Sequence, residues 1–163
     1  SAPSKIHVGD VGPKFEREMT SNVASIGDVA VSPVISQTVT TKATVTNLAV
    51  SLTTSGKPVR LQLIPGPTGG VGTPGHLKLS CTSSDYYHTG KIYLYRDGSE
   101  IAVFDFGSQT TTSLGGEVIY VSPAVIDYLD NTTSGVYTYT VSAEAYVNNV
   151  LDISNVKLVA YEL

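Results

Sequence analysis

Alternating apolar side chains in the C-terminal half are the feature that most constrains the fold of this chain. In the last segment, residues 153–163, Val156, Leu158 and Ala160 occupy every second position. A period of two places such side chains on one face of a β-strand. Further runs rich in Thr, Tyr and Val precede this segment. The pattern predicts an all-β chain whose sheets each bury one face.

The composition favours protein contacts over contacts with nucleic acid or lipid. Charged residues make up 15% of the 163 residues, against about 25% in an average soluble domain. The net charge is −4, and no basic stripe is present to neutralise phosphates, so we expect no nucleic-acid partner. The apolar runs are too short for a membrane span. The N-terminus lacks the pattern of a signal peptide, so we expect synthesis in the cytoplasm.

The chain divides into two parts by its pattern. Residues 1–36 are rich in Gly and Pro and show no sustained period, which predicts an extended N-terminal arm. Residues 37–163 contain about nine candidate strands at the spacing of an antiparallel β-sandwich or jelly roll. Only residues 122–130 have a pattern that would fit a short helix.

A change of phase interrupts the first long run of the predicted domain. Alternate positions from Val39 to Val45 form one face, and the alternation resumes in the opposite phase from Leu48 to Leu52. The switch falls at Asn47 and predicts a β-bulge or a sheet corner there.

Two tight turns are expected between the later strands. Asp97-Gly98 is a strong hairpin signal, because a type I′ turn needs positive φ at both central residues. It should join a strand with Ile92 and Leu94 inward to a return strand with Ile101 and Val103 inward. We assign this turn a structural role. A second turn at residues 148–149 should pair the strands on either side of it.

Catalytic and metal-binding patterns are missing from the sequence. His7, His76 and His88 have no His or Cys partner at zinc-ligand spacing. There is no Gly-x-Ser-x-Gly elbow. We therefore expect no catalytic residue, no metal and no cofactor. The single cysteine, Cys81, fits a buried core position, and a contact near a symmetry axis is the alternative.

One cluster and one loop are candidate contact sites. The cluster is Asp85, Tyr86, Tyr87 and His88, in which aromatic and acidic groups would suit either a sugar ring or a neighbouring protein. We favour the protein neighbour, because exposed tyrosine is common at protein interfaces. The Gly- and Pro-rich loop at residues 65–75 lacks a phosphate-binding pattern and would serve as a surface contact loop.

Several segments resemble a known group of viral proteins. Residues 46–59, 95–102, 134–141 and 153–158 resemble the C-terminal β-domains of tailed-bacteriophage fibre and decoration proteins. Over residues 38–163 this resemblance implies a jelly roll of the tumour-necrosis-factor type, a homotrimer and a structural role in the virion. It carries over no catalytic residue.

The N-terminal arm has a resemblance of its own. Residues 6–12, Ile-His-Val-Gly-Asp-Val-Gly, are similar to the first residues of several phage baseplate and virion proteins. The strand-rich domain that follows in those proteins is missing here, so the resemblance implies an anchoring arm. The side chains expected to dock it are Ile6, His7, Val8, Asp10, Val11 and Phe15.

The sequence therefore predicts a non-enzymatic virion protein. It would dock on the major capsid protein as a decoration protein or head fibre, or on a tail or baseplate protein, with the β-domain projecting outward. The alternative is a receptor-binding tip of a tail fibre or baseplate, which would recognise host surface glycans through residues 65–75 and 82–90.

Overall fold

The computed structural model describes residues 28–67, 74–84, 86–113 and 115–163. Within these ranges the chain forms β-strands and no helix. The strands are β1 (Val29–Val31), β2 (Ile35–Val39), β3 (Ala43–Ser55), β4 (Val59–Pro65), β5 (His76–Cys81), β6 (Tyr87–Arg96), β7 (Ser99–Gln109), β8 (Val118–Val121), β9 (Asp127–Asp130), β10 (Ser134–Ala145) and β11 (Asn149–Glu162).

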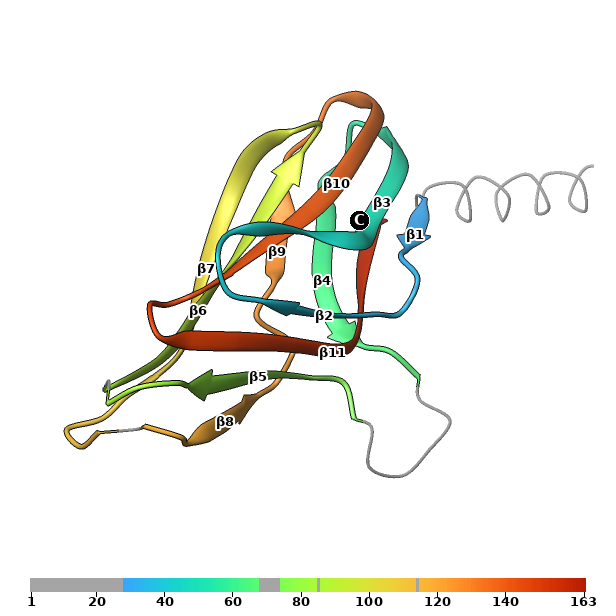
Figure 1. Cartoon of the computed structure of the whole chain (residues 1–163). Coiled ribbons are helices and arrows are strands. Elements are labelled where there is room, and N and C mark those ends of the chain that lie inside the picture. The colour runs from blue at the N-terminus through green and yellow to red at the C-terminus, as the bar shows by residue number, and fades with distance from the viewer. Residues whose placement is uncertain (1–27, 68–73, 85, 114) are drawn as a thin grey trace, which may run out of the picture.

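The strands form two antiparallel sheets that pack face to face (Figure 1). The larger sheet has the order β8-β5-β11-β4-β9, and β1 and β2 also pair with β11. The smaller sheet has the order β3-β10-β6-β7. Along the described strands, the chain crosses between the sheets six times, from β2 to β3, β3 to β4, β5 to β6, β7 to β8, β9 to β10 and β10 to β11. This strand order is that of a jelly roll, with the β5–β8 pair added to the larger sheet. The predicted fold class is confirmed.

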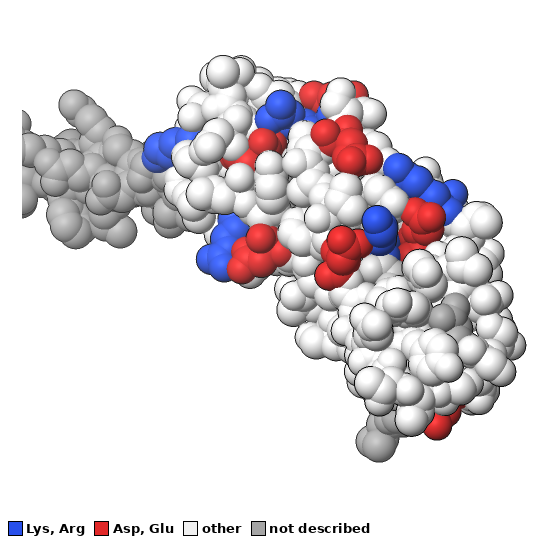
Figure 2. Space-filling view, turned by 90° about the vertical axis from the view of Figure 1, so that its left-hand side faces the viewer, with Lys and Arg blue, Asp and Glu red and all other residues white. Residues whose placement is uncertain are grey.

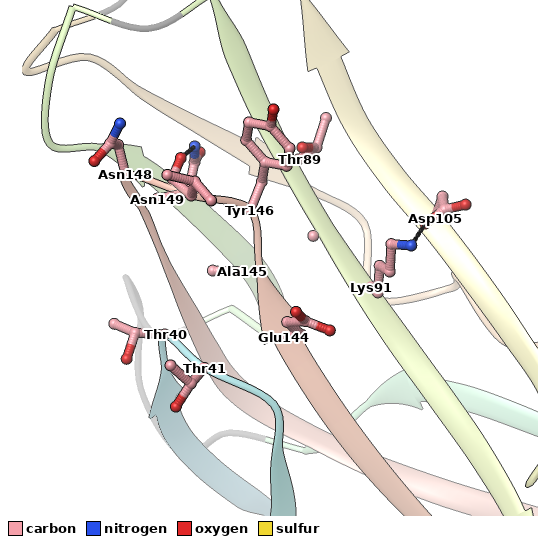
Figure 3. Close-up of a pocket in the computed structure, with 12 residues that line it drawn as sticks. Thr40, Thr41, Thr89, Lys91, Asp105, Glu144, Ala145, Tyr146, Asn148 and Asn149 are labelled. Carbon is pink, nitrogen blue, oxygen red and sulfur yellow. Dashed lines mark hydrogen bonds and ion pairs between the residues drawn. The ribbon is translucent and has the colours of Figure 1, made fainter.

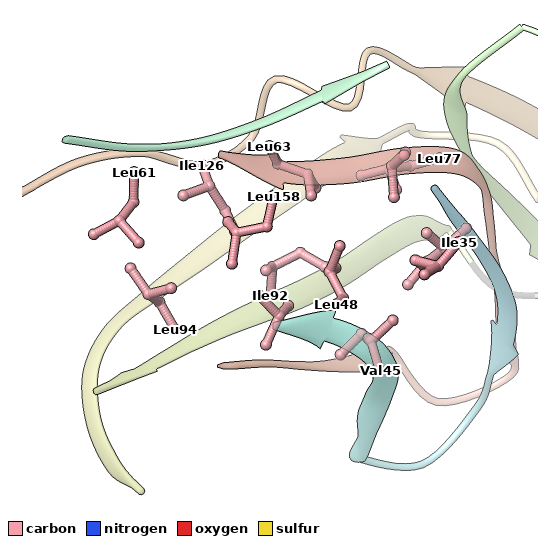
Figure 4. Close-up of a cluster of buried hydrophobic side chains, with 14 of the residues drawn as sticks. Ile35, Val45, Leu48, Leu61, Leu63, Leu77, Ile92, Leu94, Ile126 and Leu158 are labelled. Atoms are coloured by element: carbon pink, nitrogen blue, oxygen red, sulfur yellow. The ribbon is translucent and has the colours of Figure 1, made fainter. Parts of the chain in front are cut away.

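The core lies between the sheets and comes from alternate positions of their strands (Figure 4). In β11, Val156, Leu158 and Ala160 are fully buried, as their spacing predicts. Leu61 and Leu63 of β4 lie on the same side of the core, and Ile92 and Leu94 of β6 face them from the smaller sheet. Each fully buried aliphatic side chain contributes roughly 1.5–3 kcal/mol to folding.

The bulge expected at Asn47 is present. Asn47 has φ of 64°, and the pairing of β10 with β3 shifts register between Thr140 and Ser142 at this point. Leu48 and Val45 are both buried on either side of it. The continuous face expected from Val39 to Val45 is wrong, because the chain turns at residues 40–42 from the larger sheet into the smaller one.

The sandwich begins earlier than its periodicity indicates. β1 pairs with the end of β11, and β2 pairs with its middle. Between them the Ser32 hydroxyl accepts the Leu158 N–H at 2.8 Å, and the Ser32 N–H donates to the Leu158 carbonyl at 2.9 Å. Residues 28–36 are therefore part of the β-domain and not of the arm. The strands are short and Pro33 separates them, so no period of two develops in the sequence.

The helix considered for residues 122–130 is replaced by a loop and β9. Ile126 is buried in the core from the loop, and Tyr128 and Asp130 point inward from the strand. β9 pairs with β4 over Asp127–Asp130. A strand this short offers too few alternations to be told from a helical turn.

The turn at residues 148–149 is present but does not make a hairpin. Asn148 has φ of 61°, as a tight turn requires. The strands on either side, β10 and β11, lie in different sheets. The turn is thus an arch over the end of the sandwich, and sequence alone does not distinguish an arch from a hairpin.

The hairpin at Asp97-Gly98 is confirmed, with φ of 49° and 80° at its two central residues. Of the two side chains predicted to point inward from β7, Ile101 packs against the core as expected, but Val103 does not. A register shift at Leu94/Tyr95 inserts one extra residue into β7, so Phe104 packs against the core while Val103 is 40% exposed.

Candidate functional site

The predicted contact cluster does not form a single surface. Asp85 lies outside the described residues. Tyr86 is exposed, and Tyr87 is half-buried with its ring 5.2 Å from that of Tyr146. His88 is fully buried in β6, with Nε2 2.9 Å from the Glu117 carbonyl oxygen. Neighbouring strand residues point to opposite faces, so His88 cannot meet a ligand together with Tyr87.

The other predicted site residues are placed as follows. The docking residues of the arm, Ile6 to Phe15, lie outside the described residues, as does most of the loop at residues 65–75. The Asp97-Gly98 turn is tied to β10, because the Asp97 N–H donates to the Thr138 carbonyl and Asp97 Oδ1 accepts the Thr138 N–H, each at 2.8 Å. Cys81 is buried at 2% exposure, which agrees with a core position.

A cavity of about 520 Å³ opens at one end of the smaller sheet (Figure 3). It lies where β10 runs into the β10–β11 arch, beside the start of β6 and the β2–β3 turn. The lining residues are Thr40, Thr41, Thr89, Gly90, Lys91, Asp105, Glu144, Ala145, Tyr146, Val147, Asn148 and Asn149. This volume falls within the roughly 300–1,000 Å³ of small-molecule sites.

Strand register explains why these side chains meet. Glu144 of β10 stands opposite Lys91 of β6, which in turn stands opposite Asp105 of β7. Tyr146 is the first residue after β10, and its N–H donates to the Thr89 carbonyl at 2.9 Å. The cavity therefore joins a charged row to an aromatic side chain on the outer surface of the sheet.

The charged groups of the cavity are held in pairs. Lys91 Nζ lies 3.6 Å from Asp105 Oδ1, and both side chains are well exposed. Glu144 Oε2 accepts the Tyr93 hydroxyl at 2.5 Å. This hydrogen bond raises the pKa of Tyr93, so the phenol remains a donor to the carboxylate at neutral pH.

Asn149 lines the cavity and has one buried side-chain atom without a hydrogen bond. The residue is only 4% exposed. Its Nδ2 donates to the carbonyls of Tyr87 and Val147 at 3.0 and 3.2 Å. Its Oδ1 has no hydrogen-bond partner among the described residues. This oxygen is itself enclosed by protein atoms, so it does not face the open part of the cavity.

Sequence reasoning missed this site because its residues come from separate segments. Residues 40–41, 89–91, 105 and 144–149 are brought together only by the crossing of β2 to β3 and the pairing of β6, β7 and β10. The one local signal is the exposed pair Tyr146 and Val147 before the Asn148 turn.

An exposed apolar row crosses the outer face of the larger sheet. Register aligns Val29 of β1, Tyr161 of β11, Arg60 of β4 and Leu129 of β9 side by side. Val29 is 56% and Leu129 48% exposed. Arg60, the charged member, is bound to Asp127, with nitrogen–oxygen distances of 2.9 and 2.8 Å. The row presents apolar surface and a neutralised charge.

No group of His, Cys, Asp and Glu suited to a metal occurs among the described residues. Within the same ranges no helix is long and apolar enough to cross a bilayer.

The chain has no match among family models or curated proteins. Solved structures give distant likenesses. The insecticidal delta-endotoxin Cry8Ea1 from Bacillus thuringiensis is 8% identical with a TM-score of 0.40, over 76% of this chain and 19% of that one. A β-glucosidase from Paenibacillus barengoltzii is 13% identical with a TM-score of 0.35, over 75% of this chain and 10% of that one.

Two further likenesses are at the same level. Latent PorU from Porphyromonas gingivalis is 14% identical with a TM-score of 0.35, over 84% of this chain and 11% of that one. The EclA C-terminal domain, a sugar-binding protein, is 13% identical with a TM-score of 0.29, over 82% of this chain and 72% of that one. This chain spans about a fifth or less of the first three proteins. Likenesses this distant assign neither a family nor a function.

Proposed function

We propose that this chain is a non-enzymatic structural protein of a bacteriophage particle. It forms a homotrimer through the outer face of the larger sheet and docks on the major capsid protein through its N-terminal residues, with the jelly roll projecting outward. Docking on a tail or baseplate protein is the alternative location. The proposal extends the sequence resemblance to phage virion β-domains.

The observation that carries the proposal is the apolar row Val29–Tyr161–Arg60–Leu129. It spans four strands of a regular sheet and leaves two large aliphatic side chains about half exposed. The exposed aliphatic side chains stand at the two ends of the row, with Tyr161 and the paired Arg60 between them. Exposed apolar surface on a regular sheet face is a candidate interaction site on a soluble protein. Identical chains that share such a surface associate into closed symmetric oligomers.

The position of the row also suits a protein with an N-terminal anchor. Val29 belongs to β1, the first described strand, and lies beside Tyr161 near the end of the last strand. An interface on this face would therefore gather the three anchoring segments near one side of the trimer. That arrangement would multiply a weak single-arm contact through its effective concentration.

Charge placed on the row should dissociate the trimer. We expect the full chain to sediment as a trimer at micromolar concentration and the Val29→Glu/Leu129→Glu double variant to sediment as a monomer. Two carboxylates per chain would be buried without partners in the interface. Sedimentation velocity measures the mass, and circular dichroism confirms that the variant keeps its strands.

Val136→Glu is the matched control, because Val136 is 67% exposed but lies on β10 of the smaller sheet. This variant should remain a trimer. A wild-type monomer, or a double variant with wild-type mass, would refute the proposed interface.

A further inference from the structure

We propose that the cavity beside Tyr146 binds one neutral sugar ring of a surface glycan. The proposal goes beyond the structural role above and does not depend on it, since one chain supplies every lining residue.

The first argument is that the Tyr146 ring is fixed in place at the cavity. The Tyr146 ring is 46% exposed at the cavity, and Tyr87 supports it at 5.2 Å between ring centroids. Its backbone is fixed to Thr89 by the hydrogen bond described above. Figure 3 shows the ring standing beside Thr89 at the edge of the cavity. A pyranose has an apolar face of C–H groups, which packs on an aromatic ring whose hydroxyl end stays in water.

The second argument is the set of polar groups around this ring. Glu144 gives one carboxylate oxygen to Tyr93 and leaves the other, Oε1, to accept a hydroxyl. Lys91 and Asp105 offer donors and acceptors side by side, as adjacent sugar hydroxyls require. Thr40 and Thr41 add hydroxyl groups from the opposite side of β10. A small number of polar groups that converge on a partly apolar cavity is typical of small-ligand sites.

The charged side chains that line the cavity favour neutral sugars over anionic ones. The cavity contains one base, Lys91, and two acids, Asp105 and Glu144, and Lys91 is already paired with Asp105. Figure 2 views the molecule from the side where β6 and β7 lie in Figure 1, and acidic and basic side chains are interspersed there without a basic patch. A sialic acid or a phosphorylated sugar would meet the unpaired Glu144 charge, so neutral hexoses are favoured.

The test screens the full chain on an array of neutral and sialylated oligosaccharides. The neutral sugars that score are then titrated, as free glucose, galactose, mannose or N-acetylglucosamine, by protein-observed NMR. We expect saturable binding to at least one neutral sugar. Tyr146→Ala should weaken it about fivefold or more, as loss of a central aromatic contact does.

Tyr120→Ala is the matched control, since Tyr120 is 66% exposed on β8 and lies outside the cavity. It should leave the affinity unchanged. If Tyr146→Ala lowers the melting temperature, Asp105→Asn on the exposed side of the cavity provides the second test and should also weaken binding. Failure of all neutral sugars to bind, binding of sialylated sugars only, or affinity unchanged in both cavity variants would overturn the assignment.

Discussion

Asp130→Ala should cost this protein about 1–4 kcal/mol of unfolding free energy, because it leaves the buried Tyr139 hydroxyl without an acceptor and breaks a half-buried ion pair. Asp130 is 5% exposed, and its carboxylate accepts Arg96 Nη1 at 2.9 and 3.0 Å. It also accepts the hydroxyl of Tyr139, a fully buried residue, at 2.8 Å. Burial, followed by the bond to Asp130, raises the pKa of Tyr139, so the phenol remains a donor. Removing the carboxylate leaves the buried Tyr139 hydroxyl unpaired, removes the Arg96 ion pair and unlinks β9 from β6 and β10.

Asp127→Ala is the control on the same strand. Asp127 pairs with Arg60 at 2.8 Å, but its side chain is 55% exposed. An exposed pair contributes only about 0–1 kcal/mol. Urea unfolding of both variants measures the difference. Equal, small losses would show that the Asp130 cluster does not link the two sheets.

Among glycine-to-alanine substitutions in the smaller sheet, Gly107→Ala should destabilise the protein most. Gly107 has φ of +124°, and an added Cβ would lie 1.9 Å from the His88 carbonyl oxygen and 2.8 Å from Thr89 Cα. Both contacts are to backbone, so no side chain can move aside. The strain of about 1–3 kcal/mol and an overpacking term of similar size add to about 2–6 kcal/mol.

Comparison with Gly98→Ala separates the cost of backbone strain from the cost of steric contact. Gly98 has φ of +80° with nothing within 4 Å of an added Cβ, so this variant should lose only about 1–2 kcal/mol. Thermal and urea unfolding of both variants give the comparison. A Gly107→Ala variant as stable as Gly98→Ala would mean that β6 and β7 separate freely at this point.

The features predicted correctly from the sequence are those that depend on residues close together in the chain. The period of two found β5 and the buried face of β11, and turn chemistry found Asp97-Gly98. The bulge at Asn47 followed from a phase change within one strand. These features are set by the pleat and by backbone sterics, which the sequence shows directly.

The wrong predictions concern features that depend on pairing between segments distant in the sequence. β1 and the start of β2 are too short to show a period, and they form because β11 offers them a partner. Val103 of β7 was wrongly predicted to point inward, because the bulge that changes the phase of the strand depends on the register with β6. The cavity was missed for the same reason, since Lys91, Asp105 and Glu144 become neighbours only across three paired strands.

The most direct test of the proposed role is to image the phage particles on which the proposal places the chain. Particles lacking the protein are incubated with the full chain or with residues 28–163, which retain β1 and all later strands. Cryo-electron microscopy and mass spectrometry then report location and copy number. The account predicts threefold densities on the head with the full chain and bare particles with residues 28–163. Wild-type particles that lack the protein altogether would contradict it.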